Sequence, residues 1–405
     1  MTREFSKSRY RAILSGITLN AFGNGLMAPY VISWLAALPH GSIRAAGVVF
    51  GATGAGQLLA TLYAGRLLTT WPARSVLAAG LALSALAAAL LTSAHSVTLS
   101  AVVLFCLGSF QGIASAAQAT VLGTLKFGGG NEGHVWSHLQ VVLNIGQGAG
   151  FLVGGYLVTG DLTEVMRPVF LLNAVSFAAF AAVAFLVLPK HSTAMPRTQS
   201  KAGGSYRSVL AQPAARQLIL ADLIFFTFGI GFLLLLPLLA SHNGVLTMHQ
   251  VAMLLAANTL IIVCGQLTIT RLAQRLRQAV AVRLLFIGAA ASWVLVAVGI
   301  EVASRSVALA VVWVAIVLFS VTECLHTARL IPQLREAVTD PERPRILSLH
   351  VFASKAGLIA GPALGGIATA SSAQLTWLTA ACVLLVPVLF GRVNTTLELP
   401  QKAPV

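Results

Sequence analysis

Charged side chains are scarce in this chain of 405 residues, and acidic ones are the scarcest. Asp, Glu, Lys and Arg together make up 9% of the residues, with 11 acids against 26 bases. About a quarter of an ordinary soluble domain is charged. Hydrophobic residues make up 57% of the chain, which is more apolar surface than a soluble protein could keep away from water. The composition therefore excludes a soluble globular protein and indicates a membrane protein.

Cysteine is also rare, and its spacing excludes a disulfide framework. The four cysteines all fall in apolar runs and show no paired spacing: Cys106, Cys264, Cys324 and Cys382. Small apolar packing is the expected role of such residues. The fragments Glu323-Cys324-x-His326 and His134-x-x-x-His138 each provide too few ligands for a metal site. We expect no metal and no cofactor.

Sequence motifs of enzymes are missing as well. The chain lacks G-x-x-x-x-G-K-[ST], so it has no phosphate loop for ATP. The glycines of Gly51–Gly56 look like a nucleotide loop, but no strand precedes them and they lie inside an apolar run. A nucleophile elbow and a metal-peptidase motif are also absent. We therefore predict that the protein is not an enzyme and that any uphill transport uses an ion or substrate gradient.

Apolar runs long enough to cross a bilayer, about 20 residues each, recur along the whole chain. We predict an all-α integral membrane protein with twelve transmembrane helices, at residues 12–38, 43–68, 75–93, 98–125, 135–159, 168–188, 214–240, 248–270, 280–301, 307–329, 346–370 and 375–391. No segment between these spans is long enough for a separate soluble domain.

The basic residues are distributed very unevenly between the two sides of the predicted spans. Outer connections hold only Arg44, Arg167 and Arg305, and Lys355 lies within a span. The other 22 of the 26 basic residues fall on the side of the N-terminus. The positive-inside rule then places both termini in the cytoplasm, and we expect a bacterial inner (plasma) membrane. Despite a net charge of +15, this distribution predicts contact with anionic lipids and no nucleic-acid partner.

Two glycine strings show that the chain contains a duplication. Gly146–Gly155 and Gly357–Gly366 share the frame G-x-x-x-G-x-x-x-G-G and are 211 residues apart, and Gly56-Gln-Leu matches Gly265-Gln-Leu at an offset of 209. We predict two pseudo-symmetric six-helix bundles, residues 1–188 and 214–405, joined by a cytoplasmic linker at 189–213. Glycines four apart allow membrane helices to approach closely. The proposed packing residues are Gly146, Gly150, Gly154, Gly155, Gly357, Gly361, Pro362, Gly365 and Gly366.

Several motifs resemble those of the major facilitator superfamily, twelve-span type. The glycine string is similar to the fifth-span motif of its drug:proton antiporters, with Phe151 and Pro362 at the proline position. The segment Gly65–Arg74 resembles the family's loop motif G-x-L-x-D-R-x-G-R-R, with Thr69 at the acidic position. Gly108–Gly112 is similar to R-x-x-Q-G, with glycine at the arginine position. The resemblance implies a secondary transporter that works by alternating access, with the substrate between the two bundles.

Only two of the acids, Asp222 and Glu323, lie well inside predicted spans. A carboxylate in the hydrocarbon region costs free energy unless it is paired, protonated or faces water, and it is therefore a candidate for a functional residue. At 1.5 Å per residue, both acids and Lys355 lie roughly 9 to 13 Å from the inner ends of their spans. We predict proton coupling by Asp222 and Glu323, with His326 one turn further on as a relay. The alternatives are a static ion pair that locks the inner gate, and Lys355 as the partner of an anionic substrate.

Other polar side chains within the predicted spans are candidates for substrate contact, although most such residues simply hydrogen-bond between helices. The candidates are Asn20, Asn24, Gln57, Gln111, Asn144, Gln147, Asn258 and Gln266. Among these we assign substrate binding to Asn24, Gln111, Asn144 and Gln147, together with Lys355.

These features favour a monomeric, proton-coupled exporter of small amphipathic molecules, whose partners are the substrate, protons and membrane lipids. Two alternatives remain open. One is uptake or exchange of an organic anion through Lys355. The other is a receptor or assembly protein that uses a transporter fold without transporting anything.

Overall fold

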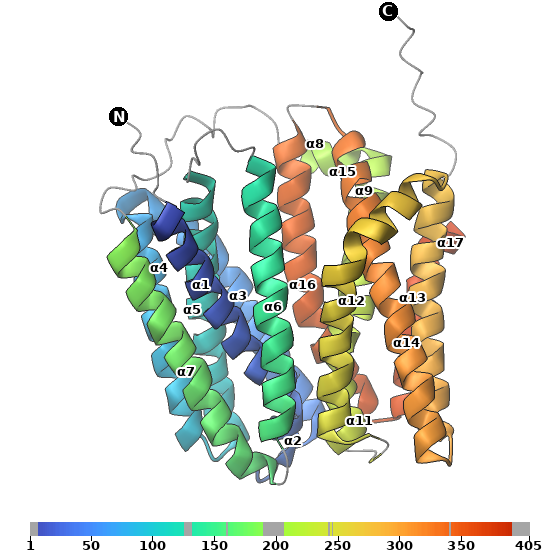
Figure 1. Cartoon of the computed structure of the whole chain (residues 1–405). Coiled ribbons are helices and arrows are strands. Elements are labelled where there is room, and N and C mark those ends of the chain that lie inside the picture. Colours follow the sequence, from blue (N-terminus) through green and yellow to red (C-terminus); the bar gives the residue numbers. More distant parts are fainter. Residues whose placement is uncertain are drawn as a thin grey trace, which may run out of the picture. The chain divides into compact units, whose positions relative to one another are not determined.

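The computed structural model describes residues 7–124, 132–158, 161–188, 206–241, 244, 246–339 and 342–390. Regular structure in these residues is helical throughout (Figure 1). Nine of the described helical segments are long and apolar enough to cross a membrane, and Val141–Leu157 and Ala373–Leu389 are shorter apolar helices. With the broken first helix, they match the twelve predicted spans.

The first half of the chain consists of long helices with short connections. They are α1 (Lys7–Met27), α2 (Val31–Ala37), α3 (Ile43–Thr70), α4 (Ala73–Leu90), the short turn η1 (Leu91–Ser93), α5 (Val97–Thr124), α6 (Glu132–Leu157) and α7 (Leu162–Val187). The first span is divided into α1 and α2 by the turn that contains Pro29. Ser42 and Asp161 begin α3 and α7, since each side chain accepts a hydrogen bond from a backbone N–H of the first turn.

The second half has more interruptions. Its helices are α8 (Tyr206–Ala211), α9 (Pro213–Ile224), α10 (Gly231–Leu233), α11 (Leu236–Ser241), α12 (Met248–Gln274), α13 (Gln278–Glu301), α14 (Arg305–Leu325), α15 (Ile331–Glu336), α16 (Arg343–Thr369) and α17 (Ala373–Phe390). Two π-helical segments, η3 (Phe225–Ile230) and η4 (His326–Leu330), lie within the seventh and tenth spans.

The chain divides into two compact units that are not simply its two halves. Unit 1 contains Met1–Gln199, Leu233–Val263 and Pro362–Ser372, and unit 2 contains Ser200–Phe232, Cys264–Gly361 and Ala373–Val405. In unit 1, α1 packs on α6 and α7, and α5 packs on α3 and α4. In unit 2, α13 packs on α14 and α17. The bundles at 1–188 and 214–405 remain a prediction.

The glycine strings pack in the same way in each unit, against the first span of their own half. Gly146 and Gly150 lie against the backbone of α1, where a Cβ at Gly150 would collide with the Phe22 carbonyl oxygen. Gly361 lies against the backbone of η3 and α10, where a Cβ would collide with the Thr227 carbonyl oxygen. Glycine is needed at these positions because the neighbouring backbones are too close for any side chain.

A second set of glycine contacts explains why unit 1 includes segments from late in the chain. Gly148 and Gly155 of α6 lie against Thr259 and Ala252 of α12. Gly366 of α16 lies against Gly47 of α3. Close approach of small residues therefore joins elements that are distant in the sequence within this unit.

Candidate functional site

Asp222, on the last turns of α9, has a completely buried side chain whose two carboxylate oxygens are both hydrogen-bonded. His326 Nε2 lies 2.8 Å from Oδ1, and His350 Nδ1 lies 2.8 Å from Oδ2. The three residues come from α9, η4 and α16, all within unit 2. We call Asp222, His326 and His350 the Asp–His–His cluster.

The two π-helical segments border this cluster. η3 begins three residues after Asp222, and η4 begins at His326 itself. A π-helical turn shifts the register of the backbone hydrogen bonds, and such turns are frequent at functional sites. Here the α13 side chains bond to carbonyl oxygens of both segments. Trp293 Nε1 donates to the Phe228 oxygen at 2.6 Å, and Gln278 Nε2 donates to the Arg329 oxygen at 2.9 Å.

Aromatic rings cover the cluster. The Phe225 ring stacks on His326 with a centroid distance of 4.5 Å. The Phe226 ring contacts His326 edge-on at 5.2 Å and His350 at 5.9 Å. The side chains of Asp222 and His326 are 0% and 3% exposed, whereas that of His350 is 15% exposed. Of the three side chains, that of His350 is therefore the most accessible from outside the cluster.

The arrangement brings together one carboxyl and two imidazole groups, each of which can bind a proton. An ionised carboxylate only accepts hydrogen bonds, so each imidazole presents an N–H to Asp222. With both imidazoles neutral the cluster carries one net negative charge, and one added proton makes it neutral. Burial penalises net charge strongly. An added proton would therefore reduce the net charge of a buried site.

In the structure, Asp222 is hydrogen-bonded to two histidines. Lys355, which lies at a similar depth in its predicted span, is not its partner. Lys355 is exposed on α16 and makes no ion pair with any described residue. Glu323 is half-buried on α14, one turn before His326. His350 was missed by the sequence analysis. The sequence did contain a signal for His350, because an ionisable side chain within an apolar span needs a partner and His350 lies near the start of the eleventh span.

The proposed substrate-binding amides belong to unit 1, whereas the Asp–His–His cluster belongs to unit 2. Asn24, Gln111 and Asn144 are half-buried and Gln147 is exposed. α1 contacts α6 through Gly25 and α7 through Gly23. At 100° per residue, Asn20 and Asn24 point away from the side on which both of these contacts are made. The face of α1 that carries the two amides is therefore not used to pack against α6 or α7.

Of the two residues of the predicted loop motif, Arg74 has a packing role in the structure and Gly65 does not. Gly65 is exposed in the last turns of α3, and a Cβ added there would have no neighbour within 4 Å. Arg74, at the start of α4, donates from a guanidinium nitrogen to the Leu188 carbonyl oxygen at 3.3 Å and lies 4.6 Å above the Phe185 ring. Arg74 thereby connects the start of α4 to the end of α7.

Within the described residues there is no group of three or more His, Cys, Asp or Glu side chains that could hold a metal ion. All four cysteines, which lie in described helices, are free. The Asp–His–His cluster therefore remains the main concentration of titratable groups in the apolar part of the described chain.

Comparison with known proteins agrees with this architecture. The family model described as Major Facilitator Superfamily matches residues 13–328, and the chain belongs to that family. A bacterial homolog of the human lysosomal transporter Spinster, solved in an inward-facing and unoccupied conformation, is similar with 12% identity and a TM-score of 0.74 over 95% of this chain and 96% of the other. No curated protein matches the chain in sequence.

Two further solved structures show the same fold. The nucleoside transporter NupG, solved as a point mutant, has 12% identity and a TM-score of 0.73, with 93% of this chain and 97% of the other covered. The human organic anion transporter MFSD10 has 15% identity and a TM-score of 0.60, with 94% and 98% covered. The predicted all-helical membrane fold of about twelve helices is confirmed. The protein is a secondary transporter of small molecules and not an enzyme.

Proposed function

We propose that this transporter is a proton-coupled exporter of small amphipathic molecules, and that the Asp–His–His cluster binds the coupling proton. The observation that carries the proposal is the fully buried Asp222 carboxylate, shared between imidazoles from two other elements. A structural ion pair can be formed by any cation, whereas a proton carrier needs a side chain that can both take up and release a proton, as an imidazole can.

The cluster also offers a way to couple proton binding to movement of α16. His350 belongs to α16, and the same helix contacts η3 and α10 through Gly357 and Gly361. Loss of the added proton leaves a buried net negative charge, which favours a state in which His350 moves and Asp222 meets water. Transport then follows alternating access, with one bundle rocking against the other. Glu323, one turn from His326, is assigned as a second proton carrier.

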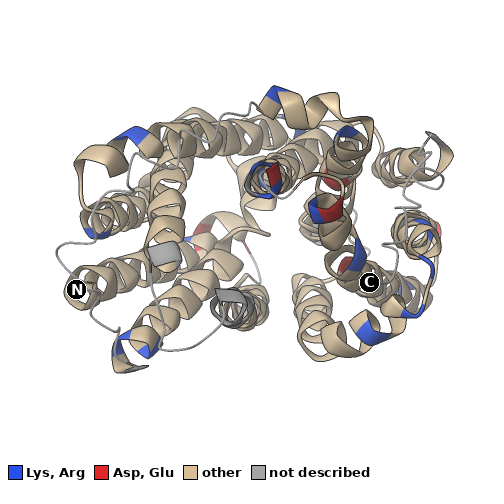
Figure 2. Cartoon of the chain, turned by 90° about the horizontal axis from the view of Figure 1, so that it is seen from above, with Lys and Arg blue, Asp and Glu red and all other residues tan. Residues whose placement is uncertain are grey.

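Orientation in the membrane is part of the same proposal. Helix ends that carry Arg66, Arg74, Arg271, Arg275, Arg335 and Arg343 are inferred to face the cytoplasm, by the positive-inside rule. Figure 2 looks onto helix ends from above and shows Lys and Arg on the turns and short connections there. We infer a bacterial inner membrane and a monomer.

The test uses purified protein in liposomes that contain a pH-sensitive dye, with a panel of fluorescent amphipathic dyes as transport probes. Asp222→Asn and Glu323→Gln, singly and together, should abolish probe-driven proton movement. Asp161→Asn removes an exposed acid at the start of α7 and should leave the flux unchanged. Unchanged proton flux in the double variant would rule out the assigned roles.

A second candidate function, uptake or exchange of an organic anion, is favoured by the exposed Lys355. Its ammonium group makes no ion pair with a described residue, although it lies in the middle of α16. A cationic side chain that lies within a membrane span and has no protein partner can bind an anionic substrate. Lys355→Ala should then remove binding of fluorescein-type anionic probes, whereas Arg345→Ala at the start of the same helix should not. Retained anion affinity in Lys355→Ala would exclude this function.

A further inference from the structure

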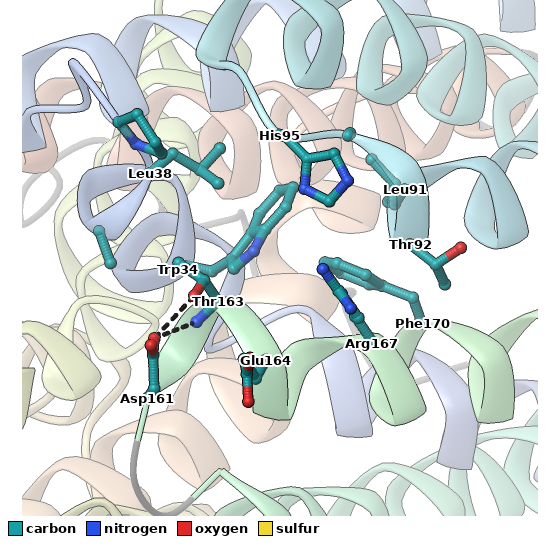
Figure 3. Close-up of a pocket in the computed structure, with 13 residues that line it drawn as sticks. Trp34, Leu38, Leu91, Thr92, His95, Asp161, Thr163, Glu164, Arg167 and Phe170 are labelled. Carbon is teal, nitrogen blue, oxygen red and sulfur yellow. Dashed lines mark hydrogen bonds between the residues drawn. The ribbon is translucent and has the colours of Figure 1, made fainter.

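A polar pocket of about 360 Å³ lies in unit 1, where α2, η1 and the start of α7 meet (Figure 3). Its apolar floor includes Trp34, Leu91 and Phe170, and its polar lining includes His95, Glu164 and Arg167. The positive-inside assignment puts this end of unit 1 on the outer side of the membrane. The pocket shares no lining residue with the Asp–His–His cluster.

The polar groups of this pocket have few partners of their own. The side chains of His95, Glu164 and Arg167 make no hydrogen bond or ion pair with any described residue. Asp161, by contrast, is occupied, because its carboxylate accepts from the Thr163 backbone N–H at 2.9 Å and from the Thr163 hydroxyl at 2.8 Å. Among its described lining residues, the pocket therefore has a free carboxylate, a free guanidinium and a free imidazole.

Trp34 adds a donor in the floor of the pocket. Its side chain is held by an edge-on contact with Phe170 at 4.8 Å, and the residue is only 2% exposed. Among the described residues nothing accepts a hydrogen bond from its indole N–H. A tryptophan buried this deeply normally finds a partner for that group. In Figure 3, the Trp34 ring lies between Asp161 on one side and Arg167 and His95 on the other.

The free charges have opposite signs and a short spacing. Glu164 and Arg167 are three residues apart on α7, which puts their Cβ atoms about 5 to 6 Å apart on one helix surface. A guanidinium and an indole N–H suit a phosphate, and a carboxylate suits an ammonium group. Phosphoethanolamine carries both of these ligand groups, separated by two carbon atoms.

The surface beside the pocket suits the rest of a lipid. Leu86 and Leu90 of α4 and Leu171 and Leu172 of α7 are exposed large apolar side chains, and α4 packs directly on α7. In a bilayer this surface would contact acyl chains, at a depth just below the pocket. One lipid molecule could therefore place its head group in the pocket and its acyl chains along α4 and α7.

We propose that this pocket binds the head group of a phosphatidylethanolamine from the outer leaflet, with the phosphate at Arg167 and Trp34 and the ammonium at Glu164. The site does not depend on proton coupling or on the identity of the transported substrate.

The proposal is tested by native mass spectrometry of the purified full chain after equilibration with equal amounts of dioleoyl phosphatidylethanolamine, phosphatidylcholine and phosphatidylglycerol. The unmodified protein should retain phosphatidylethanolamine preferentially, because phosphatidylcholine lacks ammonium N–H donors and phosphatidylglycerol lacks the ammonium group. Arg167→Gln should weaken retention of the preferred lipid about tenfold, as expected when a charged hydrogen-bonding partner is lost. Glu164→Gln should remove the preference for phosphatidylethanolamine over phosphatidylglycerol.

Matched controls are Arg44→Gln and Arg305→Gln, which remove the other two bases of the predicted outer side and should leave retention unchanged. Equal retention of all three lipids, or no change in Arg167→Gln and Glu164→Gln, would overturn the proposal. Soluble glycerophosphoethanolamine provides a separate arm. If it displaces the lipid at equal concentration, the pocket takes a free solute and the assignment to a lipid is wrong.

Discussion

Asp222 and His326 are 104 residues apart in the sequence, yet their side chains meet at 2.8 Å inside one unit. A carboxylate and an imidazole at this distance share a hydrogen bond that strengthens when the imidazole is protonated. His350 occupies the second carboxylate oxygen at the same distance. The site thus has one acceptor group, the Asp222 carboxylate, and two donor side chains, His326 and His350. Each histidine can therefore be substituted separately.

Isosteric substitutions should separate proton binding from folding. His326→Gln and His350→Asn place an amide N–H near the position of the imidazole nitrogen that meets Asp222, but neither amide can take up a proton. We expect both variants to remain folded, with probe-driven proton flux at least about tenfold lower. Thermal unfolding in detergent checks that the variants are folded, and proton flux in liposomes checks the loss of proton coupling. Normal flux in both variants would contradict a role for the histidines as proton carriers.

Alanine variants should behave differently from the isosteric ones. His326→Ala leaves one Asp222 oxygen buried without a donor, and removing one member of a buried charged pair costs about 3 to 5 kcal/mol. We expect a clear loss of thermal stability for His326→Ala compared with His326→Gln, measured in the same detergent. Equal stability of the two variants would mean that water replaces the imidazole easily.

Trp293 should stabilise the π-helical segment beside the cluster. Its indole N–H donates to the Phe228 carbonyl oxygen in η3 at 2.6 Å. Trp293→Phe keeps most of the aromatic packing but removes this donor, and we expect a loss of about 1 kcal/mol in the free energy of unfolding. Trp71→Phe, at an exposed position, is the control and should have little effect. A stability change no larger than that of the control would show that η3 does not need the hydrogen bond.

Several of these features were predictable from the sequence, for identifiable physical reasons. Hydrophobic length predicted the helices, because a bilayer core requires about 20 apolar residues per span. The cost of a buried carboxylate pointed to Asp222. The partners were harder to identify, because depth within a span does not determine which face of a helix a side chain occupies. Lys355 and His350 lie on the same helix, yet only His350 faces Asp222.

The π-helical segments were beyond the reach of hydrophobic periodicity. An apolar run gives the same hydropathy whether its backbone follows an α-helical or a π-helical register. Both segments also contact α13, whose Trp293 and Gln278 side chains donate hydrogen bonds to their carbonyl oxygens. Such contacts between distant segments have no signature in a single sequence.

Two glycines provide a matched test of helix packing. A Cβ at Gly361 would collide with the Thr227 carbonyl oxygen, whereas Gly65 has open space around it. Gly361→Ala forces two backbones apart, and we expect a loss of about 1 to 3 kcal/mol. Gly65→Ala should gain up to about 1 kcal/mol from helix propensity. Thermal unfolding of both variants checks the prediction, and a stable Gly361→Ala protein would contradict the packing described for α16.

Glu342, outside the membrane spans, should contribute stability that depends on pH. The Gln212 side-chain amide, at 3.0 Å and 3.2 Å from the two carboxylate oxygens, and the Thr339 hydroxyl lower the pKa of the Glu342 carboxyl. A lowered pKa in the folded state stabilises the protein above the unfolded-state pKa. This contribution is lost as the pH falls through the folded-state value. The stability difference between the unmodified protein and Glu342→Gln should therefore be present at neutral pH and vanish in acid. A difference that stays constant with pH would contradict this prediction.

The central claim is that the Asp–His–His cluster holds the proton that is exchanged for substrate. The most direct measurement is proton release in a weakly buffered detergent solution, recorded with a pH indicator while an amphipathic dye binds to the purified protein. We predict release of about one proton per chain on dye binding, and none from an Asp222→Asn variant that still binds the dye. Equal proton release from that variant and from the unmodified protein would contradict the account.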